Sequence, residues 1–161
     1  MKRLTTYLVL LGAAVACVAF AVSTATASPA QSTTVYKTMI IVGHTLGQKG
    51  SDGRTHDTTY GANFKVHKGQ HVVVTVYNFD EGPHTITAKG LGLKVTIPGA
   101  TNELKGIPSK TVFSFTAKKV GQFRWHCAIP CDRHGGYWAM GQGKGGPGKE
   151  GFMAGYISVT A

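Results

Sequence analysis

The sequence predicts an all-β protein, a Greek-key β-sandwich of seven to eight strands. From residue 35 onward, short runs rich in β-branched and aromatic residues are separated by Gly, Pro, Asn and Asp. In the clearest run, Val72, Val74 and Val76 alternate with the residues of the opposite face, as expected for a half-buried strand. No amphipathic stretch is long enough for a helix, and strands at this spacing are typical of an antiparallel sandwich. The expected strands cover residues 35–42, 63–66, 71–77, 84–88, 93–97, 111–116, 121–126 and 155–159.

Two segments between these strands are predicted to be loops. Residues 45–60 are mostly polar, and residues 135–151 contain eight glycines. Ordering glycine costs much backbone entropy, and a segment so rich in glycine has few side chains whose burial could offset that cost. We therefore expect a polar loop at 45–60 and a glycine-rich excursion at 135–151, between the last two strands.

The composition indicates one compact domain. The chain has 161 residues, of which 42% are hydrophobic, so it can form a core and is neither disordered nor a large multidomain enzyme. It carries 17 Lys and Arg against 7 Asp and Glu. The lysines are scattered and form no basic run, which argues against a nucleic-acid partner, whereas the positive charge points to an acidic protein partner.

The first 27 residues are typical of a secretory signal peptide. Lys2 and Arg3 precede an apolar run over residues 8–22, and the small residues 25–27 suit cleavage before Ser28. The alternatives are a retained membrane anchor and a lipid-modified Cys17. All three predict an exported domain over residues 28–161, in the periplasm, outside the cell or on its surface.

Three separate segments supply residues of the types that bind copper. His84 follows a Gly-Pro turn, Cys127, Cys131 and His134 follow the strand at 121–126, and Met153 precedes the last strand. Thiolate and thioether sulfur stabilise Cu(I), and imidazole also accepts Cu(II). These residues are the candidate metal ligands.

The order of these motifs resembles that of the cupredoxins, over residues 61–159. The pair Cys127 and Cys131, with three residues between, also resembles the binuclear copper A domain of cytochrome c oxidase subunit II and nitrous oxide reductase. That resemblance implies that both thiolates bridge two copper ions, that His84 and His134 each bind one, and that Met153 is a weak ligand. The carbonyl of Ile129 is a further ligand by the same resemblance.

The sequence departs from the copper A pattern in its spacing. Two residues rather than three separate Cys131 from His134, and the methionine is displaced, so Met140 competes with Met153 for the axial position. The acidic residue usual between the two cysteines is absent.

Two other interpretations of the cysteines stay open. In a mononuclear blue-type site, Cys127, His84 and His134 form the trigonal plane, Met153 is axial and Cys131 is left over. A disulfide between Cys127 and Cys131 needs no metal. A spare exported thiol beside copper is an oxidation hazard, which favours the binuclear site.

The remaining histidines outside the motifs are predicted to be solvated: His44, His56, His67 and His71.

The resemblance implies electron transfer rather than catalysis by this chain alone. The expected partner is a redox protein with an acidic surface, such as a cytochrome c or a terminal oxidase, and contact with a membrane is expected only if the N-terminal segment is retained. The alternatives are copper storage or delivery, and an anchored copper subunit of a terminal oxidase.

Overall fold

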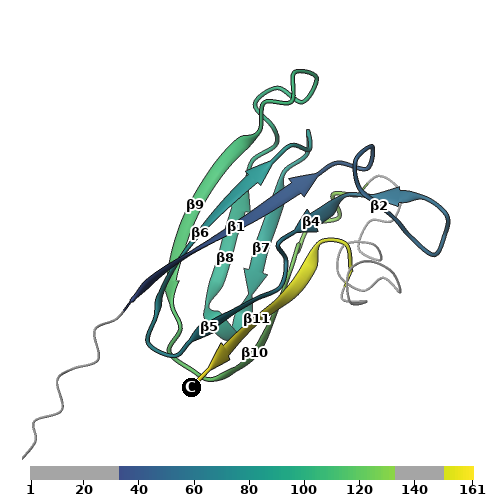
Figure 1. Cartoon of the computed structure of the whole chain (residues 1–161). Helices are drawn as coiled ribbons and strands as arrows, with labels where there is room; N and C mark the ends of the chain where they lie inside the picture. The colour runs from purple at the N-terminus through teal and green to yellow at the C-terminus, as the bar shows by residue number, and fades with distance from the viewer. Residues whose placement is uncertain (1–32, 133–150) are drawn as a thin grey trace, which may run out of the picture. The chain divides into compact units, whose positions relative to one another are not determined.

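The computed structural model describes residues 33–132 and 151–161. Most of these residues form strands, and Figure 1 shows that the strands make two facing layers. The strands are β1 (Thr34–Val42), β2 (Gln48–Lys49), β3 (Thr55–His56), β4 (Thr58–Tyr60), β5 (Phe64–His67), β6 (His71–Asn78), β7 (His84–Ala88), β8 (Leu93–Ile97), β9 (Ser109–Thr116), β10 (Gly121–His126) and β11 (Ala154–Thr160), with a short 3-10 helix, η1 (Lys89–Leu91), between β7 and β8.

The two layers are a four-stranded sheet in the order β4-β1-β6-β9 and a five-stranded sheet in the order β5-β11-β10-β7-β8. Strands β2 and β3 form a separate hairpin. The predicted all-β sandwich is therefore confirmed. Two pairs, β1 with β6 and β5 with β11, are parallel, so the expectation of a purely antiparallel sandwich is wrong there. Alternation shows which face of a strand is buried, but it does not show in which direction the neighbouring strand runs.

All eight predicted strands are present, and their bounds differ by at most two residues. The polar loop predicted at residues 45–60 is wrong in part, because it contains β2, β3 and β4. Thr58 and Thr59 are buried there, where β4 pairs with β1. Threonine suits a pleated, half-buried strand although it is polar.

The core lies between the two sheets. Val72, Val74 and Val76 are each fully buried, as their alternation predicted. From the other sheet, Trp125 is also fully buried, and its indole N–H donates to the carbonyl of Ala62 at 2.7 Å. The aromatic ring thus fills the core while its one polar group is satisfied.

The described part of the chain contains no helix that is both long and apolar enough to cross a membrane. The predicted signal peptide or anchor at residues 1–27 lies outside the described residues and stays a prediction.

Candidate metal centre

One end of the five-stranded sheet brings the predicted motifs together. His126, the last residue of β10, pairs with Thr87 of β7 on one side and with Ala154 of β11 on the other. Cys127 follows directly, and the first residue of β7 is His84. The sheet therefore places the cysteine segment beside the histidine loop.

Hydrogen bonds hold Cys127 from two sides, from β7 and from the residue that precedes β11. Its N–H donates to the carbonyl of Met153 at 2.8 Å, and the N–H of Thr85 donates to its sulfur at 3.3 Å. The residue is fully buried. A donor aimed at a buried sulfur stabilises the thiolate form, which is the form that binds metals.

Cys131 lies in a tight turn beyond it. Its N–H donates to the carbonyl of Ile129 at 3.0 Å, and its Sγ lies 3.2 Å from that of Cys127, with no disulfide between them. The hydrogen bond from Cys131 lowers the pKa of the Cys127 thiol to about 4, against the effect of burial. The same bond, together with burial, raises the pKa of Cys131 above its ordinary range. The metal-free pair therefore holds one thiolate and one thiol.

The ring of His84 lies between these sulfurs and a carboxylate. Its Nδ1 is 2.8 Å from the Cys131 Sγ, and its Nε2 is 2.9 Å from Oδ2 of Asp80. Burial favours the neutral ring, but the hydrogen bond to Asp80 and the nearby negative charges of Cys127 and Asp80 outweigh it and raise the pKa of His84 to about 9. A carboxylate on one ring nitrogen orients the other toward a metal, as in many metal sites.

Asn78, at the end of β6, fixes the loop that carries Asp80. Its side-chain amide donates to the carbonyls of Gly82 and Pro98, both at 2.9 Å, and its Oδ1 accepts the N–H of Asp80 at 2.9 Å. The N–H of Gly82 in turn donates to Oδ2 of Asp80 at 3.0 Å. The orientation of His84 is thus built into the backbone of this loop.

Three of the five predicted ligands converge. The ligand atoms of His84, Cys127 and Cys131 lie within 4.8 Å of one another. Met153 is fully buried, and its sulfur accepts the hydroxyl of Thr59 at 2.9 Å. His134 lies outside the described residues, as do Met140 and nearly all of the glycine-rich segment. Metal binding by all of these residues stays a prediction.

A second group of acidic residues lies on the Nε2 side of His84. Ligand atoms of Asp57, Asp80 and His84 also fall within 4.8 Å of one another, and all three residues are buried. Burial, together with repulsion from Asp80 and Asp132, raises the pKa of Asp57 to about 7. The histidine is thus held between sulfur atoms and carboxylates.

Asp57 gives a prediction for the stability of the metal-free protein. Since its folded pKa of about 7 exceeds the unfolded value of 3.8, the stability that it contributes is present below pH 3.8 and is lost as pH rises through 7. Asparagine resembles the protonated acid, so Asp57→Asn is expected to unfold like the wild type at pH 4. At pH 8 it should be more stable by roughly 2–4 kcal/mol. Urea unfolding at both pH values measures the difference. Equal stability of the variant and the wild type at pH 8 would show that the charged carboxylate of Asp57 does not destabilise the fold.

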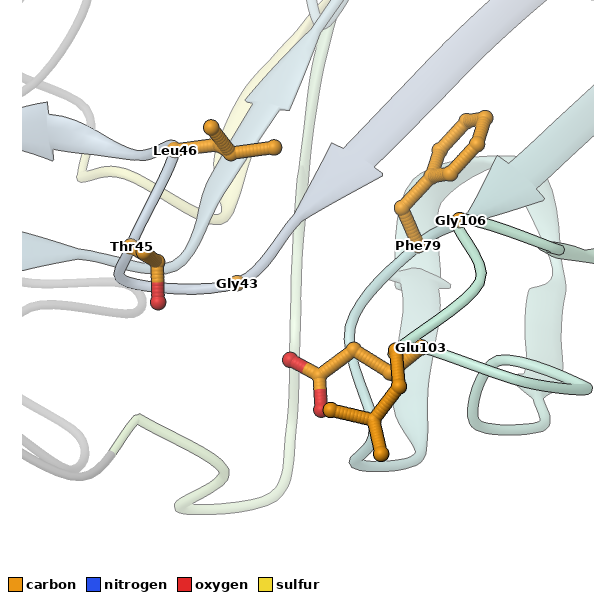
Figure 2. Close-up of a pocket in the computed structure, with 7 residues that line it drawn as sticks. Gly43, Thr45, Leu46, Phe79, Glu103 and Gly106 are labelled. Atoms are coloured by element: carbon orange, nitrogen blue, oxygen red, sulfur yellow. The ribbon is translucent and has the colours of Figure 1, made fainter.

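A pocket of about 330 Å³ lies beside the loop that carries Asp80 (Figure 2). Phe79, which precedes Asp80, lies on one side of it, and Leu46, which follows β1, lies on the other. A Cβ on Gly43 would approach Oδ1 of Asp80 to 2.5 Å, so the pocket wall touches the carboxylate that orients His84. The lining is mostly apolar, and among the described residues it includes none of the predicted ligands His84, Cys127, Cys131 and Met153. The lining residues are Gly43, Thr45, Leu46, Phe79, Glu103, Leu104 and Gly106.

Sequence reasoning missed the polar residues around the predicted ligands. The prediction that His56 is solvated is wrong, because its side chain is fully buried between Asp52 and Asp132. Asp80 carried a weak signal, a carboxylate four residues before a predicted ligand. Asp57 carried none, because its neighbours are far away in the chain. Asp132 directly follows Cys131, but its partner His56 is 76 residues away and could not be predicted.

The sequence comparisons give no relative: no family model matches the chain, and no curated protein matches it. Solved structures do resemble it. The multicopper oxidase mgLAC has a TM-score of 0.51 at 21% identity over 78% of this chain and 38% of that one. A laccase from Pediococcus acidilactici has a TM-score of 0.50 at 14% identity, covering 79% and 26%. A purple cupredoxin from Nitrosopumilus maritimus has a TM-score of 0.39 at 15% identity, over 77% of this chain and 99% of that one.

The scores of the first two show a shared fold. The chain spans well under half the length of either oxidase, so the likeness concerns one part of them. The predicted cupredoxin-like β-sandwich is confirmed, and it carries a buried Cys/His cluster at one end.

Proposed function

We propose that this chain is an exported electron-transfer protein that holds copper through His84, Cys127 and Cys131, with His134 and Met153 completing the ligands. The observation that carries the proposal is the convergence of one imidazole nitrogen and two sulfurs in a buried cluster. This donor set fits copper, which can accept and release one electron there as Cu(II) and Cu(I).

The surroundings of the three residues favour electron transfer over exchange of the metal. Cys127 and His84 are fully buried, so a chelator or a delivery partner cannot reach them directly. Hydrogen bonds fix their positions before any metal binds. The N–H of Thr85 donates to the sulfur of Cys127, the N–H of Cys127 donates to the carbonyl of Met153, and the carboxylate of Asp80 accepts from Nε2 of His84. Ligands held in this way move little when the charge at the site changes.

We further propose that both thiolates bind, as in a binuclear copper A centre. In a blue-type site Cys131 has no role, yet its sulfur is 2.8 Å from Nδ1 of His84 and 3.2 Å from the sulfur of Cys127. A cysteine outside the site need not face both other donors. We propose Met153 as the axial ligand of this centre, with Met140 as the alternative.

The proposed partner is an acidic redox protein, such as a cytochrome c or a terminal oxidase, with which the chain exchanges single electrons in respiration. A formal net charge of +10 favours encounter with such a surface, because complementary charge mainly raises association rates. If residues 1–27 are retained as an anchor, the chain would work at the membrane as part of an oxidase.

The test combines voltammetry with electron exchange. Copper-loaded protein should show a reversible one-electron wave, and in stopped flow it should oxidise reduced cytochrome c at a rate that falls as salt increases. His67→Gln, at the exposed last residue of β5, should leave both signals unchanged. Copper that passes to a chelator on reduction, with no electron exchange, would contradict electron transfer and point to storage or delivery.

A further inference from the structure

His56 comes from the short β3 strand and is distant in sequence from every predicted ligand. Its Nδ1 is 3.0 Å from Oδ2 of Asp132, the residue next to Cys131, and its Nε2 is 3.1 Å from Oδ1 of Asp52. Its ring stacks on Phe152, the residue next to Met153, with the centroids 4.7 Å apart. One imidazole therefore contacts the neighbours of two predicted ligands.

Backbone contacts from the same segment reinforce this link. The N–H of Asp57 donates to the same Oδ2 of Asp132 at 3.1 Å. The N–H of Thr59 donates to the carbonyl of Phe152 at 2.9 Å, and its hydroxyl donates to the sulfur of Met153. The side chains of His56 and Asp132 are both fully buried, so water does not compete for these contacts.

The position of His56 is itself well defined. Residue 56 pairs with Gln48 in the β2–β3 hairpin, and its carbonyl accepts the hydroxyl of Thr58 at 2.8 Å. A Cβ at Gly47 would collide with that carbonyl, so only glycine allows the hairpin to pack so closely. The hairpin is thus a rigid support for the ring.

We propose that His56 is a positioning residue that clasps Asp132 and Phe152 together and so fixes Cys131 relative to Met153. The proposal rests on the proposed function for the role of those two ligands, but the clasp itself exists without metal. We call the contacts of His56 with Asp132 and Phe152 the His56 clasp. Its function is to hold the second thiolate and the thioether at a fixed separation, although they are distant in sequence.

The test uses two variants that remove different halves of the clasp. Phenylalanine in His56→Phe keeps a stacking ring and loses both hydrogen bonds, whereas His56→Asn keeps a short polar donor and loses the ring. We expect both variants to bind copper about 10- to 100-fold more weakly, as for other residues that orient metal ligands. Their thiolate absorption and reduction potential should also shift. His67→Phe, at an exposed histidine, is the matched control.

A metal-free measurement separates failure of the clasp from failure of the proposed function. The amide of Asp57 donates to Asp132, so its hydrogen exchange should be faster in His56→Phe than in the wild type. If the wild-type protein gives no thiolate absorption with copper, the proposed function is overturned but the clasp is not. Folded His56→Phe with wild-type exchange at Asp57, and with wild-type spectrum and potential where copper binds, would overturn the clasp.

Discussion

Replacing Cys131 with serine is expected to halve the copper that the protein holds, from two ions to one, while a thiolate absorption band from Cys127 remains. The reason is that the two sulfurs lie 3.2 Å apart and both face the histidine, so each can bridge a pair of ions. Serine lacks the thiolate that selects copper, and a single sulfur cannot hold a second ion in the same way. Metal analysis and the visible spectrum of the loaded variant measure both changes.

Cys127→Ser is the matched comparison for Cys131→Ser. The double variant, with both cysteines replaced by serine, shows what remains when neither thiolate is present. Each single variant should keep one thiolate, whereas the double variant should lose the absorption band and lower copper affinity by about 100-fold or more, beyond the usual effect of a residue outside the ligand set. A Cys131→Ser spectrum and stoichiometry identical to those of the wild type would mean that Cys131 is not a ligand.

Trp125→Ala is expected to have the largest effect on stability, lowering the free energy of unfolding by about 3–5 kcal/mol. The side chain is fully buried, so its removal leaves a large cavity between the two sheets. The carbonyl of Ala62 also loses its hydrogen-bond donor. Trp125→Phe fills most of the space and should cost less, mainly through the lost hydrogen bond. Urea unfolding of the metal-free protein measures the difference.

The control for this series is Val112→Ala. Val112 lies on β9 and is 54% exposed, so its truncation should change stability by no more than about 0.5 kcal/mol. If Trp125→Ala cost no more than this control, Trp125 would not be central to the core.

The strands and the cluster of His84, Cys127 and Cys131 could be predicted from the sequence because their signals are local patterns. Alternation at residues 72–76 marked a strand with a buried face, and the spacing of Cys127, Cys131 and His84 relative to strand ends marked the candidate centre. Each of these signals lies within about ten residues of chain.

The polar surroundings of the centre could not be read, because they depend on contacts between distant segments. His56 and Asp132 are 76 residues apart in sequence, and nothing near His56 distinguishes it from a surface residue. Asp57 lies in a segment that composition alone marks as a loop. Its burial follows from the pairing of β4 with β1, which brings it toward Asp80.

The electron paramagnetic resonance spectrum of the copper-loaded wild-type protein tests the central claim most directly. If Cys127 and Cys131 bridge two copper ions, the spectrum should show hyperfine splitting by two equivalent copper nuclei, together with intense thiolate absorption. Splitting by a single nucleus with intense thiolate absorption would contradict the binuclear centre in favour of a blue-type site. An ordinary Cu(II) spectrum without thiolate absorption would contradict copper binding by the two cysteines.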